Sequence, residues 1–113
     1  MNAPLIVNFV PTGMVPTRAM SPHVPISVAE IVEDVHRAAE LGITVAHLHA
    51  RDPDETPSCR AELFSEIIAK IRRFAPELVI CVSLRWRSFP GFAGYSASLS
   101  LVGEAKPDTA SLA

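Results

Sequence analysis

Residues 43–49 read Ile-Thr-Val-Ala-His-Leu-His, and residues 78–83 read Leu-Val-Ile-Cys-Val-Ser. Both runs are short and mostly apolar, which is typical of strands buried in a parallel sheet. Between them lies a predicted helix, residues 61–74. Its apolar side chains recur at helical spacing: Phe64, Ile67, Ile68, Ile71 and Phe74. The order strand, amphipathic helix, strand predicts an α/β fold whose parallel sheet is covered by helices.

A similar strand–helix unit precedes this stretch. Residues 5–10 are an apolar run and predict a first buried strand. Residues 11–26 contain four prolines and predict a long, stiff loop. Ser27 followed by Glu30 has the spacing of a capping box, which opens a helix, and Gly42 is expected to end that helix.

Beyond the third strand we expect an irregular stretch over residues 84–95, a short helix over 96–102 and the start of a fourth strand at 109–113. Eight units of about 35 residues would make a (β/α)₈ TIM barrel of about 250 residues or more. We therefore interpret residues 1–113 as an incomplete (β/α)₈ TIM barrel. They would form the N-terminal part of a single barrel domain, with about three βα units and the start of a fourth strand. A doubly wound sheet is disfavoured because no Gly-x-Gly-x-x-Gly motif follows the first strand. Either fold leaves an unpaired edge strand.

Composition argues against several function classes. Ten Lys and Arg against twelve Asp and Glu give a net charge of −2, which argues against binding to nucleic acid or an anionic membrane. No apolar run approaches the ~20 residues of a membrane helix, and residues 1–4 lack the basic start of a signal peptide. Cys59 and Cys81 match no zinc-binding spacing and are expected to be free thiols. We expect a cytoplasmic protein.

His47 and His49 are the most informative polar residues. Strand side chains alternate, so both rings should point to one face with Cα atoms about 6.5–7 Å apart, and they can converge on one metal ion. They end a strand, where ligands gather in parallel α/β folds. The alternative is a pair of structural histidines with satisfied hydrogen bonds. Catalytic zinc takes three protein ligands, and no third stands out, because we expect His23 to be a solvated loop residue and His36 to lie on a helix surface.

Other polar groups near strand ends are candidate substrate ligands. Ser83 ends the third strand and could donate a hydrogen bond to a substrate carboxylate or carbonyl, or else be a turn or cap residue. Thr12 and Gly13 follow the first strand, and a glycine there lets backbone approach a ligand closely. A plain tight turn explains those two residues equally well.

Two arginine-containing stretches could bind anions. Arg51 follows the histidine pair and could clamp an anion, or it could pair with Asp52 or Asp54 on the surface. Residues 85–87 read Arg-Trp-Arg and are a candidate anion or stacking patch.

Five segments carry a further signal: Pro-Thr-Gly-Met-Val-Pro-Thr (11–17), Ser-Pro-His-Val-Pro-Ile-Ser (21–27), His-Leu-His-Ala-Arg-Asp (47–52), Val-Ile-Cys-Val-Ser (79–83) and Lys-Pro-Asp-Thr-Ala-Ser-Leu (106–112). In this order they resemble the β-keto acid cleavage enzymes, whose type member is the 3-keto-5-aminohexanoate cleavage enzyme of lysine fermentation. The resemblance implies a (β/α)₈ barrel with a divalent metal, usually Zn²⁺. It also implies conversion of a β-keto acid and acetyl-CoA into acetoacetate and a new acyl-CoA.

The resemblance also implies roles for individual residues. His47 and His49 would be two of the metal ligands, and the family's third ligand, a later glutamate, has no counterpart in these residues. Ser83 would help to hold the substrate carboxylate, and Ser111 would border the same pocket. The residues expected to bind substrate are thus Thr12, Gly13, Arg51, Ser83 and Ser111. The parent protein would be a homo-oligomeric acyltransferase.

Three hypotheses remain open from the sequence. In the first, the chain is the N-terminal portion of a β-keto acid cleavage enzyme and is inactive by itself. The second is a metal-dependent hydrolase barrel, although such barrels commonly place the His-x-His pair on their first strand. The third is a non-enzymatic, truncated remnant.

Overall fold

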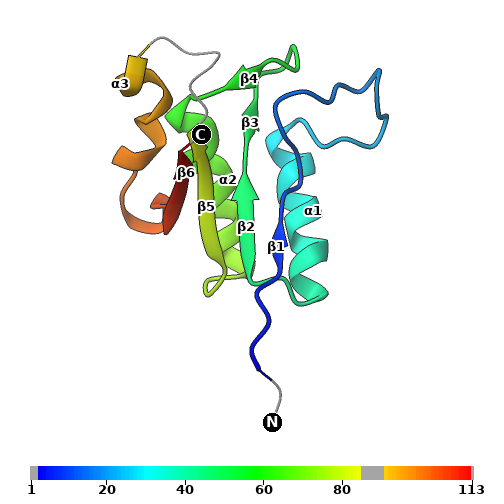
Figure 1. The fold of residues 1–113 in the computed structure, drawn as a ribbon, viewed down its shortest axis with the longest axis vertical. Coiled ribbons are helices and arrows are strands. Elements are labelled where there is room, and N and C mark those ends of the chain that lie inside the picture. The colour runs from blue at the N-terminus through cyan, green and yellow to red at the C-terminus, as the bar shows by residue number, and fades with distance from the viewer. Residues whose placement is uncertain (1–2, 85–90, 113) are drawn as a thin grey trace.

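The computed structural model describes residues 3–84 and 91–112 and contains a four-stranded sheet. Its strands are β1 (Asn8–Phe9), β2 (Val45–Leu48), β5 (Val79–Leu84) and β6 (Thr109–Leu112). They lie side by side in this order, and every neighbouring pair is parallel (Figure 1). The parallel α/β sheet predicted from the sequence is confirmed.

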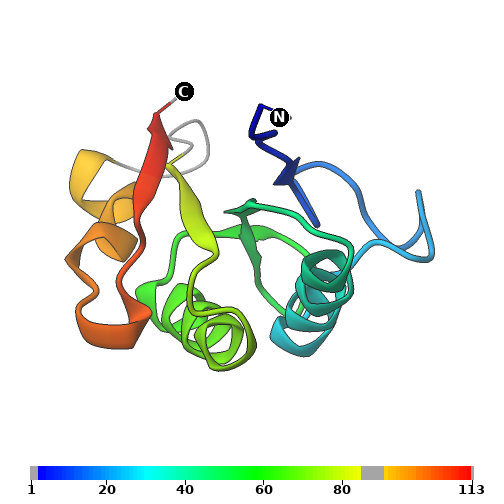
Figure 2. The ribbon, with the colours of Figure 1, turned by 90° about the horizontal axis from the view of Figure 1, so that it is seen from below.

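Two helices, α1 (Val28–Glu40) and α2 (Ala61–Phe74), cover the same face of this sheet (Figure 2). A doubly wound sheet carries helices on both faces, whereas the crossovers of a (β/α)₈ barrel stay on the outside. The core fills the space between helices and sheet. Its most deeply buried members include Ile31, Val35, Leu48, Ile67, Ile68, Ile71, Ile80 and Val82. This arrangement is that of consecutive units in a barrel wall.

The ends of α1 follow from its sequence. The Ser27 hydroxyl accepts a hydrogen bond from the Glu30 N–H at 3.1 Å, and the Ser27 N–H donates to the Glu30 carboxylate at 3.0 Å. Gly42, just past the end, has φ 97°, a left-handed conformation that glycine adopts without steric cost. The predicted capping box and helix end are confirmed.

The end of α2 fixes the fourth strand. Arg72 donates to the Leu78 carbonyl at 2.6 Å and to the Asp108 carboxylate at 2.7 Å. That carboxylate also accepts the Ile80 N–H at 2.8 Å. The start of β6 is therefore held to both α2 and β5, and the predicted fourth strand is confirmed at Thr109–Leu112.

The first strand is shorter and more exposed than predicted. Residues 5–10 were expected to form a buried strand, but β1 covers only Asn8–Phe9, and Leu5 and Ile6 are 77% and 78% exposed. In the described residues β1 is an outer strand, so the segment before it lacks the neighbours that would bury it. β6 is the other outer strand among the described residues.

The segment 50–60 links β2 to α2 and has regular structure of its own. It contains an antiparallel hairpin of β3 (Ala50–Arg51) and β4 (Pro57–Ser58). Glu55 in its turn has φ 72°, the left-handed region that few residues other than glycine occupy.

The segment after β5 also differs from the prediction. Within the expected irregular stretch lies a short helix, α3 (Gly91–Tyr95). The helix predicted over 96–102 is reduced to a 3₁₀ turn, η1 (Ala97–Ser100), which is followed by a second one, η2 (Gly103–Ala105). Both turns pack against α2.

Cys59 and Cys81 are free thiols, as predicted. Among residues 3–84 and 91–112, no helix combines the length and the apolar character needed to cross a membrane.

Candidate functional site

The face of the sheet away from α1 and α2 carries the polar side chains. In β2, Ala46 and Leu48 are buried against the helices, whereas His47 between them faces the other way. Strand pairing aligns His47 with Cys81 on β5, and Cys81 with Thr109 on β6. We call this side the open face, because no described helix covers it (Figure 2). Its polar members are His47, His49, Cys81, Ser83, Thr109 and Ser111, and of these His47, His49, Ser83 and Ser111 lie towards the C-terminal ends of the strands.

The two histidine rings lie side by side on the open face. Their centroids are 5.1 Å apart, with 41° between the ring planes, and both residues are half-buried. Burial lowers the pKa of His47, which favours the neutral imidazole, the form that binds metal ions. The predicted placement of the two rings is confirmed, and their role as metal ligands stays a prediction.

These two imidazoles fit part of a catalytic zinc site, which uses three protein ligands and keeps one open position. Across the described ranges 3–84 and 91–112, no group of three or more His, Cys, Asp or Glu is placed to hold a metal ion. The described residues thus offer two imidazole donors, and a complete site needs a further ligand from elsewhere.

Two hydroxyl groups lie on neighbouring strands of the same face. Ser83 of β5 is paired directly with Ser111 of β6, and both residues are half-buried. Neighbouring strands are about 4.8 Å apart, so the two hydroxyls can donate to the two oxygens of one carboxylate. Ser83 lies inside β5, so it is not the turn or cap residue of the alternative reading.

Thr12 and Gly13 lie in the loop that follows β1. Thr12 is 4% exposed, and its hydroxyl lies 3.4 Å from Arg51 Nη1. A Cβ at Gly13 would have only Pro16 Cδ nearby, at 4.0 Å. Packing therefore leaves room for a ligand to approach the Gly13 backbone.

One reading of the sequence expected Arg51 to pair with Asp52 or Asp54, but in the described part of the chain it pairs with neither carboxylate. It is 4% exposed and donates to the backbone carbonyls of Gly13, Pro16 and Glu55. Asp52 pairs instead with Arg60 at 3.3 Å, and the Asp54 carboxylate accepts the Thr56 hydroxyl at 2.6 Å. The fold turns the Arg51 guanidinium inward, towards the loop after β1.

Sequence reasoning did not find Glu55 and Arg18. The Arg18 N–H donates to the Glu55 carboxylate at 2.7 Å, which ties the loop after β1 to the β3–β4 hairpin. The Arg18 side chain bonds Glu30 at the start of α1. The only sequence signal for these contacts is the turn-forming composition of residues 52–56.

The other two histidines lie away from the pair. His23 is exposed in the proline-rich loop, as predicted. His36 is exposed on α1, also as predicted, where its ring packs 4.4 Å from that of Phe74 and its Nε2 lies 3.6 Å from Glu40. The candidate patch at residues 85–87 lies outside the described residues.

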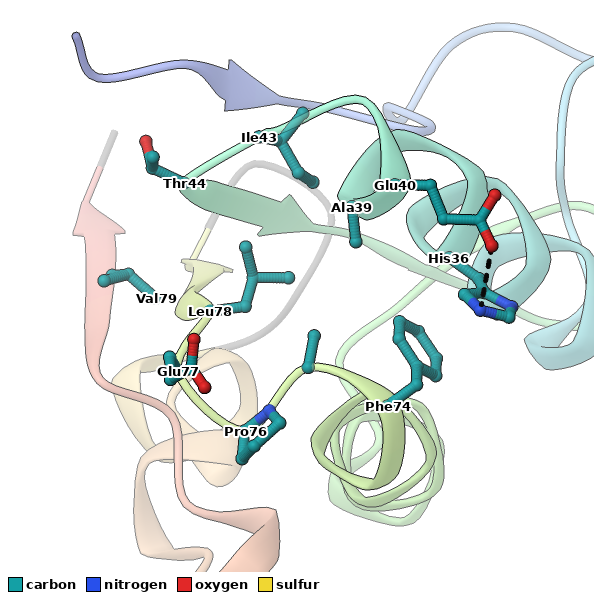
Figure 3. A pocket seen from close by; sticks show the side chains of 11 residues that line it. His36, Ala39, Glu40, Ile43, Thr44, Phe74, Pro76, Glu77, Leu78 and Val79 are labelled. Atoms are coloured by element: carbon teal, nitrogen blue, oxygen red, sulfur yellow. Dashed lines mark ion pairs between the residues drawn. The ribbon is translucent and has the colours of Figure 1, made fainter.

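A pocket of about 550 Å³ opens beside His36 (Figure 3). It lies between the C-terminal ends of α1 and α2 and the N-terminal starts of β2 and β5, with Glu40, Phe74, Thr44 and Val79 in its lining. This is the end of the sheet opposite to the one where His47 and His49 lie. The pocket is therefore separate from the candidate metal ligands.

The sequence is similar to that of a known enzyme family. Residues 4–113 match the β-keto acid cleavage enzyme family. The chain is 41% identical over 113 residues to 3-oxoadipate:acetyl-CoA acetyltransferase of Cupriavidus necator, and it spans 38% of that protein's length. It is 34% identical over 76 residues to the 3-keto-5-aminohexanoate cleavage enzyme of Acetoanaerobium sticklandii, with 67% of this chain and 28% of the relative covered.

The fold also matches solved structures. The apo structure of ObcA superposes with a TM-score of 0.71 at 22% identity, over 81% of this chain and 23% of that one. The likeness supports the expected architecture, a partial (β/α)₈ barrel with three βα units and a fourth strand. Since the family match extends over nearly all of its residues, the chain belongs to the β-keto acid cleavage enzyme family.

Proposed function

We propose that these residues are the N-terminal part of a single-domain (β/α)₈ acyltransferase that uses a β-keto acid and acetyl-CoA. Its products would be acetoacetate and a new acyl-CoA. C2 of the keto acid would form a bond to the acetyl carbonyl carbon while the C–S bond of acetyl-CoA breaks and releases CoA. The bond between C2 and C3 would then break as the CoA thiol forms a new thioester with the C3 carbonyl carbon. Family membership and the acetyl-CoA-dependent names of relatives such as the Cupriavidus enzyme support this reaction class.

His47 and His49 would hold a divalent metal ion, with Zn²⁺ as the first candidate because imidazole suits it. When bound, the ion supplies a Lewis acid that polarises the keto oxygen of the substrate. The single observation that carries this assignment is the pair of rings 5.1 Å apart on the open face. A third ligand from outside the described residues would complete the site, so the 113 residues alone should show no turnover.

The hydroxyls on β5 and β6 would orient the substrate. Ser83 and Ser111 are register partners on the open face, on the side of the sheet that carries the histidines. They would donate hydrogen bonds to the substrate carboxylate, which fixes the keto group relative to the metal. The backbone at Thr12 and Gly13 would close the site from the loop after β1.

We also propose a cytoplasmic location for the protein. The free thiols of Cys59 and Cys81 suit a reducing, cytoplasmic compartment. We propose that the full-length protein is a homo-oligomer there, which size-exclusion chromatography with light scattering would test.

The decisive experiment combines metal binding with product analysis in the full-length protein. Zn²⁺ affinity, measured by competition with a chelator, should fall at least about 100-fold in His47→Ala and in His49→Ala, because loss of even an outer-shell partner costs about 10–100-fold. His23→Ala, which removes an exposed imidazole from the loop, is the matched control and should bind Zn²⁺ normally.

The product assay separates the reaction classes. Acyl-CoA should form from a β-keto acid only when acetyl-CoA is present, and both carbons of the acetyl group should appear in acetoacetate. Hydrolysis of the keto acid without acetyl-CoA would instead favour the metal-dependent hydrolase. Unchanged Zn²⁺ affinity in both histidine variants would refute the metal assignment.

A further inference from the structure

Arg51 is a buried cation that is held by backbone oxygens. Its Nη2 lies 2.7 Å from the Pro16 carbonyl, its Nη1 3.0 Å from the Gly13 carbonyl, and its Nε 2.7 Å from the Glu55 carbonyl. With 4% of the residue exposed, these contacts replace the water that the guanidinium loses. Arg51 thus joins the loop after β1 to the hairpin that follows β2.

The geometry of this contact requires an arginine. Three acceptors from two separate segments surround one planar group, and each bond uses a donor in the fixed fork of the guanidinium. A lysine carries all its donors on a single nitrogen and cannot reach the three carbonyls together. Within residues 3–84 and 91–112 the guanidinium makes no ion pair with a carboxylate, and Arg51 is buried, so its role is not that of a surface ion pair.

A second observation points to the same contact. Glu55 occupies the left-handed region at φ 72°, a conformation that persists in such a residue only where its surroundings hold it. Its carbonyl accepts from Arg51 Nε, its N–H donates to the Asp52 carbonyl at 2.8 Å, and its carboxylate accepts the Arg18 N–H at 2.7 Å. Two of these bonds hold the turn within the hairpin, and the third ties it directly to the loop after β1.

The loop is also anchored at its far end. The Arg18 guanidinium makes two hydrogen bonds with Glu30, at 2.6 Å and 3.0 Å, and Glu30 belongs to the capping box of α1. Arg51 and Arg18 thus hold the two ends of the stretch that contains Thr12 and Gly13 and leads to the start of α1.

We propose that Arg51 is a positioning residue, which fixes the loop after β1 so that Thr12 and Gly13 meet the substrate beside the histidine pair, and which does not itself touch the substrate. This replaces the anion-clamp role expected from the sequence. The part that concerns the substrate rests on the proposed function. The part that concerns the loop rests on the contacts alone.

The test compares Arg51→Lys with the wild type in the full-length protein. Hydrogen exchange of the Arg18, Met20 and Ser21 amides, which are bonded within or from this loop, should become at least about 10-fold faster. Exchange in α2 and Zn²⁺ affinity should not change. KM for the β-keto acid should rise at least about 10-fold while kcat stays within about threefold, because the loop affects binding and not the metal.

Glu55→Gly provides a second variant that is safer for folding. It keeps the carbonyl that Arg51 needs and removes the steric cost of the left-handed conformation. It also removes the carboxylate that accepts the Arg18 N–H. Exchange should become faster at Arg18 while KM rises less than in Arg51→Lys. Arg60→Lys, which alters an exposed arginine on the other side of the hairpin turn, is the control and should change neither quantity.

Each outcome decides the proposal. A raised KM without faster loop exchange would mean that Arg51 contacts the substrate directly. Faster exchange with an unchanged KM would mean that the loop is held for stability only. If the wild type shows no acyltransfer, the proposed function fails, and the exchange data alone still decide whether Arg51 holds the loop.

Discussion

The two faces of the sheet are made by alternate residues of the same strands, yet they differ in polarity and, at most positions, in burial. On the side of α1 and α2, Ala46, Leu48 and Val82 are fully buried. On the open face, His47 and Ser83 are half-buried and Val79 is 39% exposed. Neighbouring residues of one strand therefore differ in role: one packs against the helices, and the next lies on the open face.

This difference follows from the position of the helices. A strand with a helix on one side must be apolar at every second residue, because a polar group there would be buried without a partner. The other side of a barrel strand faces the interior and its mouth, where polar groups at the C-terminal strand ends can meet a ligand. The histidine pair and the two serines occupy these positions.

The largest expected effect is a difference in stability when the same substitution is made on each face of the sheet. Val82→Ala removes two methyl groups from a fully buried site and should lower the free energy of unfolding by about 2–3 kcal/mol. Val79→Ala, on the same strand but on the open face, should lower it by less than about 1 kcal/mol. Urea unfolding followed by circular dichroism measures both values. Equal losses would show that the open face is packed as tightly as the helix side.

A smaller effect is expected in substrate binding. Ser83→Ala removes a proposed donor to the substrate carboxylate, and a hydrogen bond to a charged group contributes about 1.5–3 kcal/mol. KM for the β-keto acid should rise about 10–100-fold in the full-length protein, while the free energy of unfolding should change by less than about 0.5 kcal/mol.

Ser65→Ala on α2 is the matched control for that measurement, because it removes a hydroxyl from the helix layer. It should leave KM unchanged. A loss of stability without a rise in KM in Ser83→Ala would place Ser83 with the packing residues and would remove the contrast between the faces.

Much of the fold could be predicted because each element carries its own local signal. The bounds of α2 follow from its apolar spacing and from Pro76, and the start of α1 follows from Ser27 and Glu30. The prediction of a buried strand at Leu5 and Ile6 was wrong because hydrophobicity alone does not reveal that, among the described residues, the first strand is paired on one side only. Burial of a strand is a property of the sheet and not of the strand's own residues.

The site was predictable only in part, for a related reason. Side chains alternate along a strand, so the spacing of two residues between His47 and His49 already predicts that they share a face. The contacts of Arg51 could not be predicted because its acceptors are backbone carbonyls up to 38 residues away in the chain, and a carbonyl has no signature in the sequence. The hairpin that directs Arg51 inward depends on a left-handed Glu55, which composition does not predict either.

The smallest expected effect concerns the start of α1, which supports the helix-covered face. The pKa of Glu30 is lowered from 4.5 to about 2, mainly by the hydrogen bond from Arg18 and next by the bond from the Ser27 backbone. The unfolded chain therefore binds a proton more readily than the folded one. The stabilisation is fully present above about pH 4.5 and is lost as the pH falls towards 2. Because the Glu30 side chain is 39% exposed, solvent screening should reduce this contribution to about 1 kcal/mol.

Glu30→Gln should remove that part of the acid dependence, because glutamine does not titrate. Unfolding free energies measured from pH 6 to pH 2.5 should converge for the wild type and the variant at the acid end and differ by about 1 kcal/mol at the neutral end. The exposed Glu33, which bonds Arg37 within α1, is the control position, and Glu33→Gln should run nearly parallel to the wild type. Since α1 covers only one side of the sheet, Zn²⁺ affinity at a fixed pH should be the same in all three proteins. A change in Zn²⁺ affinity in Glu30→Gln would show that the two faces are coupled through the loop after β1.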